Sequence, residues 1–115
     1  MFSLLAFFLL LYSCTSEKGE LEPISNCDTS ITTYAAAVED IIITNCAYTG
    51  CHIAGGSGNG DFLTYAGVKL KVDNGSFRNR IYTTKDMPPV GQTQQLSSCD
   101  KEKILKWLNN GAQDN

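Results

Sequence analysis

The chain has little histidine, tryptophan, proline and positive charge. Its 115 residues include one histidine (His52), one tryptophan, three prolines, and nine Lys or Arg side chains against twelve acidic ones. No basic run is interleaved with aromatic residues, which argues against a nucleic-acid partner. The longest apolar run, residues 2–12, is shorter than the ~20 residues of a bilayer-spanning helix. The length is enough for one small domain.

The apolar run has instead the length of the hydrophobic segment of a secretory signal. It ends in LYSC, residues 11–14, which resembles the bacterial lipobox, in which a cysteine is acylated before the signal is cleaved. We predict a signal peptide over residues 1–13 and a mature chain that starts at Cys14. Acyl chains on Cys14 would anchor it to a bacterial membrane, in the periplasm or at the cell surface. An ordinary signal with a free Cys14, or a short buried apolar segment, is the alternative.

The residues after Cys14 are rich in Ser, Glu, Gly and Pro and poor in bulky apolar side chains. Such a composition does not bury enough surface to order itself. We therefore predict a lipidated tether over residues 14–26 and a folded domain over residues 27–115. A domain of this size has a thin core and often depends on a cofactor or on cross-links.

The number of cysteines is odd, which requires an explanation in an exported chain. There are five, and lipidation of Cys14 leaves four. If Cys46 and Cys51 share a function, the remaining pair, Cys27 and Cys99, brackets the domain. An oxidising compartment favours a disulfide between them. This bond would close a loop of about 72 residues, for which the chain-entropy model gives ~4 kcal/mol.

Three segments have the pattern of helices, and strand signals are weak. The first is predicted from Ser30 to Cys46, with Asp28 or Ser30 as its cap. The second is predicted over residues 63–73, with Phe62 on its apolar face and a stop at Asn74-Gly75. The third begins after Ser97 or Ser98 and ends at Gly111, with Asp100 in its first turn.

Two loops separate these helices, and the fold class is all-α. Residues 54–61, AGGSGNGD, contain four glycines, which makes a regular element improbable. Residues 76–96 have no long periodic run, so we predict an irregular segment that something must hold in place. The expected architecture is therefore about three helices with long loops.

The segment NCAYTGCH, residues 45–52, contains the most specific chemistry. A cysteine pair followed directly by histidine is typical of covalent haem, with two thioether links and the histidine as an axial ligand. The usual pair has two intervening residues, whereas four separate Cys46 from Cys51. On one unbroken helix a five-residue step leaves two side chains ~140° apart. The first helix should therefore end near Cys46, and residues 47–50 should bulge, with Gly50 as the permissive position.

Three other interpretations of this segment stay open. Cys46 and Cys51 could form a simple disulfide. Together with His52 and either Cys27 or Cys99 they could bind zinc, although an exported chain favours oxidation of its thiols. Cys51 and His52 could be a nucleophile and its base, but adjacent residues rarely adopt that geometry and no orienting carboxylate is evident.

Met87 favours haem, because small cytochromes with His/Met ligation need a thioether sulfur on the other face of the iron. It lies in KDMPPVG, where Pro88 and Pro89 stiffen the loop, and the only other methionine is Met1. The order NCAYTGCH, a Gly-rich loop, LTYAGVKLKVDNGSFRNRIY, MPPVG and LSSCDKEKILKWLNNGA resembles small class I-like cytochrome c domains of bacterial lipoproteins. The resemblance covers residues 27–113.

The resemblance implies a small cytochrome c-like fold wrapped around one covalent haem c with its iron. It assigns the thioether links to Cys46 and Cys51, and the axial ligands to His52 and Met87. Pairing of haem propionates with arginines after the second helix is a further expectation. These arginines are Arg78 and Arg80, and the alternative is that they simply lie exposed at the surface. Tyr65 and Tyr82 could line the haem pocket or fill the core. The resemblance places four further residues in the core: Trp107, Leu108, Ile42 and Val38.

These roles predict a membrane-anchored, monomeric electron carrier that meets redox partner proteins, and not an enzyme. Lys69, Lys71 and Lys85 could steer an acidic partner or simply face solvent. The main alternative is a haem-free lipoprotein, stapled by disulfides, that acts as a binding module. A haem peroxidase is a weaker alternative, because His52 is the only histidine and no distal acid–base group is evident.

Overall fold

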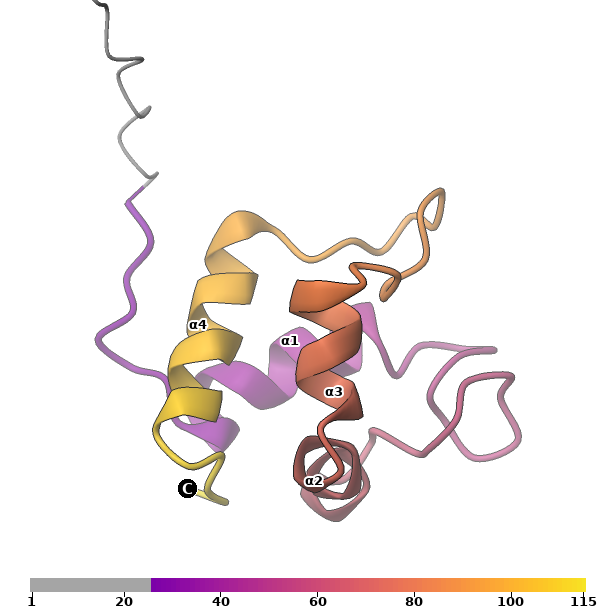
Figure 1. Ribbon diagram of the computed structural model, residues 1–115, viewed down its shortest axis with the longest axis horizontal. Coiled ribbons are helices and arrows are strands. Elements are labelled where there is room, and N and C mark those ends of the chain that lie inside the picture. Colours follow the sequence, from indigo (N-terminus) through magenta and orange to yellow (C-terminus); the bar gives the residue numbers. More distant parts are fainter. Residues whose placement is uncertain (1–25) are drawn as a thin grey trace, which may run out of the picture.

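Residues 26–115 are described by a computed structural model, shown in Figure 1. The predicted signal peptide, Cys14 and the tether up to residue 25 lie outside the described residues. The described part is helical and contains no strand, which confirms the all-α class. In chain order its elements are η1 (Tyr34–Val38), α1 (Glu39–Asn45), α2 (Tyr65–Asp73), α3 (Ser76–Arg78), η2 (Asn79–Thr83) and α4 (Ser98–Asn109).

The first helix begins later than predicted. Its opening π-helical turn, η1, starts at Tyr34 and continues directly into α1, so the predicted start at Ser30 is wrong. Asp28 accepts a bond from the backbone N–H of Ser30 at 2.9 Å, which makes a local turn and not a helix cap. The first free N–H groups of η1 are instead satisfied by Asn115. Its side-chain Oδ1 accepts from Tyr34 at 3.0 Å, and its backbone oxygen accepts from Ala35 at 2.9 Å.

The end of the first helix agrees with the prediction made from the cysteine spacing. α1 ends at Asn45, and Cys46 has left helical geometry, with φ −125° and ψ −40°. The next residues form turns up to Gly50, whose φ is +89°. Only glycine adopts this backbone conformation without strain. The bulge between the two cysteines is thus confirmed.

The second helix matches its predicted end but begins two residues late. α2 starts at Tyr65, because Thr64 adopts an extended conformation and its hydroxyl caps the helix by accepting from the Gly67 N–H at 3.2 Å. The helix stops before Gly75, which has φ +81°. Phe62, predicted on the apolar face of this helix, precedes it and is buried in the loop.

The prediction of an irregular segment over residues 76–96 is wrong for its first eight residues. α3 and η2 form one continuous helical stretch over 76–83. Phe77 and Ile81, four residues apart, lie on the same helical face and are both about 5% exposed. Burial of these two side chains in the core stabilises the helical stretch. This is an effect of tertiary packing, and two apolar residues alone are too weak a pattern to predict it from the sequence.

α4 is the element that local sequence specifies best. Ser97 accepts from the backbone N–H of Asp100 at 3.0 Å, and the Asp100 carboxylate accepts from the backbone N–H of Ser97 at 3.0 Å. This reciprocal capping box satisfies two N–H groups that a helix start otherwise leaves free. The helix ends before Gly111, at φ +97°. The predicted boundaries of this helix are confirmed.

Removing the cap of α4 should weaken the domain measurably. We expect Ser97→Ala to lower the free energy of unfolding by about 1 kcal/mol, because the N–H of Asp100 loses its acceptor. Urea unfolding followed by far-UV circular dichroism measures this change. Ser98→Ala is the matched control, because Ser98 is the first helical residue and not the cap. Equal effects of the two variants would contradict the capping role.

The core lies where the first helix crosses α4. The rings of Tyr34 and Trp107 lie 5.5 Å apart, and the Trp107 indole N–H donates to the backbone oxygen of Gln113 at 3.0 Å. The core contacts predicted between the first and last helices are confirmed, with Leu108 partly buried. The largest fully buried side chains are Trp107, Ile42, Ile104, Val38 and Val68.

A disulfide ties the beginning of the domain to its last helix. It joins Cys27 to Cys99, the predicted pair, with 5.3 Å between the Cα atoms. Lys106 holds the same segment, because its ammonium group donates to the backbone oxygen of Thr29 at 2.7 Å. Figure 1 shows this segment running beside α4, with the long loops that follow α1 and η2 on the opposite side of the molecule.

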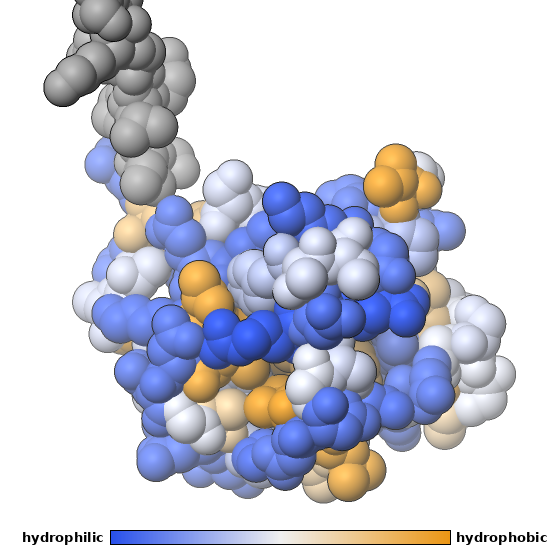
Figure 2. Space-filling view, in the orientation of Figure 1, coloured by the Kyte–Doolittle hydropathy of each residue, from blue (hydrophilic) through white to orange (hydrophobic). Residues whose placement is uncertain are grey.

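The surface seen in the same orientation is mostly hydrophilic, with apolar groups scattered over it (Figure 2). Val90, in the loop after the two prolines, is the most exposed large apolar residue of the described chain, at 93%. Among residues 26–115 no helix has the length and apolar content that a membrane span requires.

Candidate functional site

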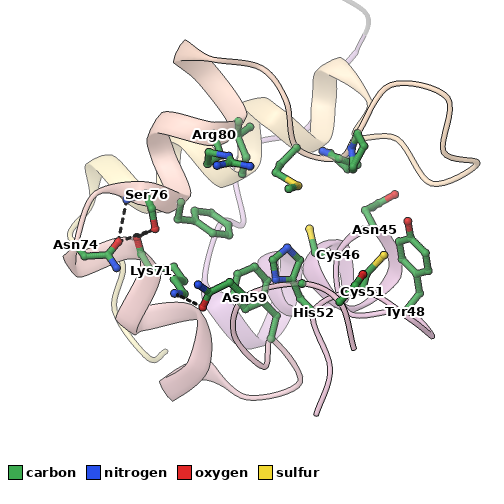
Figure 3. A pocket seen from close by; sticks show the side chains of 18 residues that line it. Asn45, Cys46, Tyr48, Cys51, His52, Asn59, Lys71, Asn74, Ser76 and Arg80 are labelled. Atoms are coloured by element: carbon green, nitrogen blue, oxygen red, sulfur yellow. Dashed lines mark hydrogen bonds between the residues drawn. The ribbon is translucent and has the colours of Figure 1, made fainter. Parts of the chain in front are cut away.

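One cavity of about 460 Å³ lies between the long loops and the helical stretch over 76–83 (Figure 3). This volume is within the range of small-molecule and cofactor sites, ~300–1,000 Å³. Its walls come from four separate parts of the chain, within residues 45–52, 57–62, 71–81 and 87–89. Together these walls contain five of the predicted site residues: Cys46, Cys51, His52, Arg80 and Met87.

The two cysteines of the cavity are free thiols and are not joined to each other. The loop between them is closed by backbone bonds. Cys51 N–H donates to the Tyr48 oxygen at 3.0 Å, and His52 N–H donates to the Cys46 oxygen at 3.1 Å. This folding presents both thiols and the imidazole to one space. Figure 3 shows the Cys46 sulfur and the His52 ring pointing into the cavity.

Burial controls the chemistry of Cys46. Burial, together with a smaller contribution from the nearby Cys51, raises the pKa of the thiol to about 12. The group is therefore a neutral thiol at pH 7, whereas nucleophilic attack and zinc binding both need a thiolate. This environment does not favour a thiolate at Cys46, and it does not bear on the interpretation of Cys51 and His52 as a nucleophile and its base.

His52 is held by packing. Its ring is stacked on that of Phe62, with 4.2 Å between the centroids and 3° between the planes. Nδ1 is buried and has no hydrogen-bond partner among the described residues. Burial lowers the pKa of His52, and the backbone near Asn59 and Gly60 partly opposes this shift. The imidazole is thus mainly neutral at pH 7, the form that binds metals.

Met87 is positioned by the end of η2. Its backbone N–H donates to the Arg80 carbonyl at 3.3 Å, and the N–H of Asp86 donates to the same oxygen at 3.1 Å. The Arg80 side chain also pairs with the Asp86 carboxylate at 2.8 Å. Beyond the prolines, Gln95 donates to the Pro89 oxygen at 2.8 Å. The bonds to Arg80 attach the methionine loop to the helical stretch over 76–83, and the Gln95 bond closes the loop on itself.

The two arginines predicted near the haem lie in different places. Arg80 lines the cavity, whereas Arg78 does not and donates to the Asn109 side chain at 2.8 Å. Lys71 of α2 lines the cavity as well and donates to the Asn59 side chain at 2.8 Å. The sequence indicated Lys71 only as a possible partner-steering charge. One local signal distinguishes it from Lys69, because Lys69 pairs with Asp73 four residues on and Lys71 has no acidic residue at that spacing.

Tyr65 and Tyr82 pack against the core, which is the second of the two places expected for them. Tyr65 and Tyr82 do not line the cavity, and their hydroxyls donate to the backbone oxygens of Ala112 at 2.8 Å and Lys101 at 2.6 Å. Tyr48, which no sequence pattern singled out, does line it, and its buried hydroxyl has no hydrogen-bond partner among the described residues. Its position between the two cysteines is the one signal that could have indicated it.

The remaining alternatives have little geometric support. The disulfide between Cys27 and Cys99 removes both candidates for the third thiolate of a zinc site. Within the described part of the chain, no three His, Cys, Asp or Glu side chains form a group that could hold a metal ion. A two-ligand site of one imidazole and one thioether is a different case, because the porphyrin supplies the other donors. No family model, curated protein or solved structure matches the chain, so its function must be argued from this cavity.

Proposed function

We propose that the chain is a membrane-anchored c-type cytochrome that carries electrons. One observation carries the proposal. A single cavity is lined by two cysteines with free thiols, the only histidine of the chain, and Met87, a residue 35 positions after His52. These are the four groups that a covalent haem with His/Met ligation requires. The Cys14 anchor and the location at a bacterial membrane, periplasmic or at the cell surface, belong to the same proposal.

The residues of the cavity fit a haem c in character. Cys46 and Cys51 would form the thioether links, and His52 and Met87 would supply the axial ligands. Phe62, Phe77 and Ile81 give the cavity apolar walls, as a porphyrin face requires. When bound, the haem supplies a one-electron redox couple whose potential methionine ligation raises.

Two cations are suited to the haem propionates. Figure 3 shows Arg80 and Lys71 on the side of the cavity away from Cys51. The guanidinium of Arg80 already pairs with Asp86, whereas the ammonium of Lys71 contacts the neutral side chain of Asn59. The charge of Lys71 is therefore less neutralised than that of Arg80, and Lys71 would bind one haem propionate. Arg80 would bind the second propionate while it keeps its pair with Asp86. Lys71 thus takes the role near the propionates that was predicted for Arg78.

The ligand set favours electron transfer over catalysis. With His52 and Met87 both bound, no position on the iron is free for a substrate, and the chain has no second histidine to act as acid or base. A monomer with an exposed cofactor edge and a membrane tether would make brief contacts with redox partner proteins. The alternative, a haem-free binding module, would use the same apolar cavity for an organic ligand.

The visible absorption spectrum tests the proposal. The full chain is produced in cells that contain haem-attachment machinery, purified from their membranes and reduced with dithionite. We expect the sharp bands of a low-spin c-type haem and an intact mass that includes one haem and the acyl chains. A colourless protein that is otherwise folded would contradict the cytochrome and leave the binding module as the explanation.

Replacement of Met87 separates a ligand from a core residue. We expect Met87→Leu to open the sixth position of the iron, so that the ferrous variant binds carbon monoxide while the wild type binds little. The measurement is the shift of the Soret band on addition of the gas. Val90→Ala is the matched control, because Val90 lies in the same loop and is 93% exposed. Absence of carbon monoxide binding in Met87→Leu would show that this sulfur is not a ligand.

A further inference from the structure

The stacking of Phe62 on His52 is not explained by the ligand set alone. The two rings are almost parallel, 3° apart, and their centroids are separated by 4.2 Å. This is a face-to-face contact over the proposed ligand, and it fixes the plane of the imidazole. The backbone reinforces it, because the Phe62 N–H donates to the His52 carbonyl at 2.9 Å.

A metal-bound histidine is usually oriented in another way. Its second ring nitrogen donates to a carboxylate, a carbonyl or a water, and this bond sets the ring plane. Here Nδ1 is buried without a partner among the described residues. The backbone around Asn59 and Gly60 lies close but does not meet hydrogen-bond geometry with Nδ1. The orientation of the ring therefore needs a different physical cause.

The Gly-rich loop also approaches the ring closely. A Cβ built on Gly58 would lie 2.8 Å from Nδ1 and 2.9 Å from Cγ of His52. Such distances are far below ordinary contact, so glycine is required here by close approach. Gly58 is held in place by donation from its N–H to the Cys51 oxygen at 3.2 Å. The imidazole thus has little room to rotate.

Phe62 is itself held firmly. It is about 5% exposed, and its ring meets the edge of Phe77 with 6.0 Å between centroids and 61° between planes. Phe77 belongs to the helical stretch over 76–83 that forms the other wall of the cavity. The ring plane of His52 is therefore connected to the core through two aromatic contacts.

We propose that Phe62 is a positioning residue, which sets the plane of the His52 imidazole by stacking where a hydrogen bond from Nδ1 usually does so. The proposal rests on the cytochrome function. In the same proposal, the close approach of Gly58 to Nδ1 and Cγ limits rotation of the ring. An aromatic ring at position 62 should be sufficient, whatever its substituent.

Electron paramagnetic resonance of the ferric full-length protein tests this role, because its g values depend on the plane of an axial imidazole. We expect one low-spin signal in the wild type. Phe62→Leu should lose that single signal and give shifted or multiple g values, and Phe62→Tyr should restore it. Tyr34→Leu is the matched control, because it also removes a buried aromatic ring, 3% exposed, but one that does not line the cavity, and it should keep the wild-type g values.

If Phe62→Leu does not fold, Gly58→Ala tests the orientation of the same imidazole ring. Its Cβ would displace the ring from the side of Nδ1, and the same shift of g values is expected. Wild-type g values in a folded Phe62→Leu or Gly58→Ala variant would overturn the positioning role and leave the cytochrome function intact. A wild-type protein without haem would overturn both.

Discussion

Replacing Cys46 and Cys51 together with alanine is expected to abolish covalent attachment of haem completely. Both thiols line the cavity beside His52, and burial keeps the pKa of Cys46 at about 12, so that its thiol stays protonated. No other thiol of the described chain is free to replace them. Denaturing electrophoresis with haem staining, together with intact mass, measures the loss. Each single variant should keep one thioether link and so remain stained.

The matched control removes the same number of cysteines elsewhere. Cys27→Ala with Cys99→Ala deletes the disulfide and leaves the cavity residues in place. This control should still stain for haem when it is purified under native conditions. Staining that survives in the Cys46→Ala, Cys51→Ala protein would contradict the thioether assignment, although His52 and Met87 could still bind a dissociable haem.

Loss of the disulfide is expected to have the largest effect on stability. We expect Cys27→Ser with Cys99→Ser to lower the free energy of unfolding by about 4 kcal/mol, because the bond closes a loop of 72 residues in the unfolded chain. Small domains are stable by only ~5–15 kcal/mol in total. Urea unfolding of variant and wild type, both loaded with haem, gives the difference.

Reduction of the wild type provides the control for this measurement. Dithiothreitol-treated wild type should unfold at the same urea concentration as the double serine variant, which separates loss of the bond from any effect of the serines. Lys106, which bonds Thr29, should keep the first segment near α4 in both proteins. A change below about 1 kcal/mol would show that the unfolded chain gains little freedom when the bond is cut.

Local signals predicted some elements well. α4 begins at Ser97 and ends before Gly111, because a capping box and a left-handed glycine act within a few residues of the helix ends. The break after α1 was predicted from the haem interpretation together with helix geometry, since two thiols five residues apart cannot meet one porphyrin edge from an unbroken helix. Elements whose ends depend on residues close together in the sequence can be predicted from the sequence.

Long-range contacts account for the elements that were misjudged. η1 starts at Tyr34 and not at Ser30, and the acceptors for its first N–H groups come from Asn115, at the other end of the described chain. The stretch over 76–83 is helical because Phe77 and Ile81 are buried by other elements. Neither fact leaves a periodic pattern that a sequence can show.

The sequence by itself determined which reactive groups this protein has: two thiols beside its one imidazole, and one methionine before two prolines. Tertiary structure alone decided which other side chains face them. Successive residues of an α-helix are ~100° apart, so Arg78 and Arg80 point in different directions once their segment is helical. Arg80 then lines the cavity with Lys71, while Arg78 reaches Asn109. The same packing brings Phe62 against His52, a contact that the order of residues along the chain does not specify.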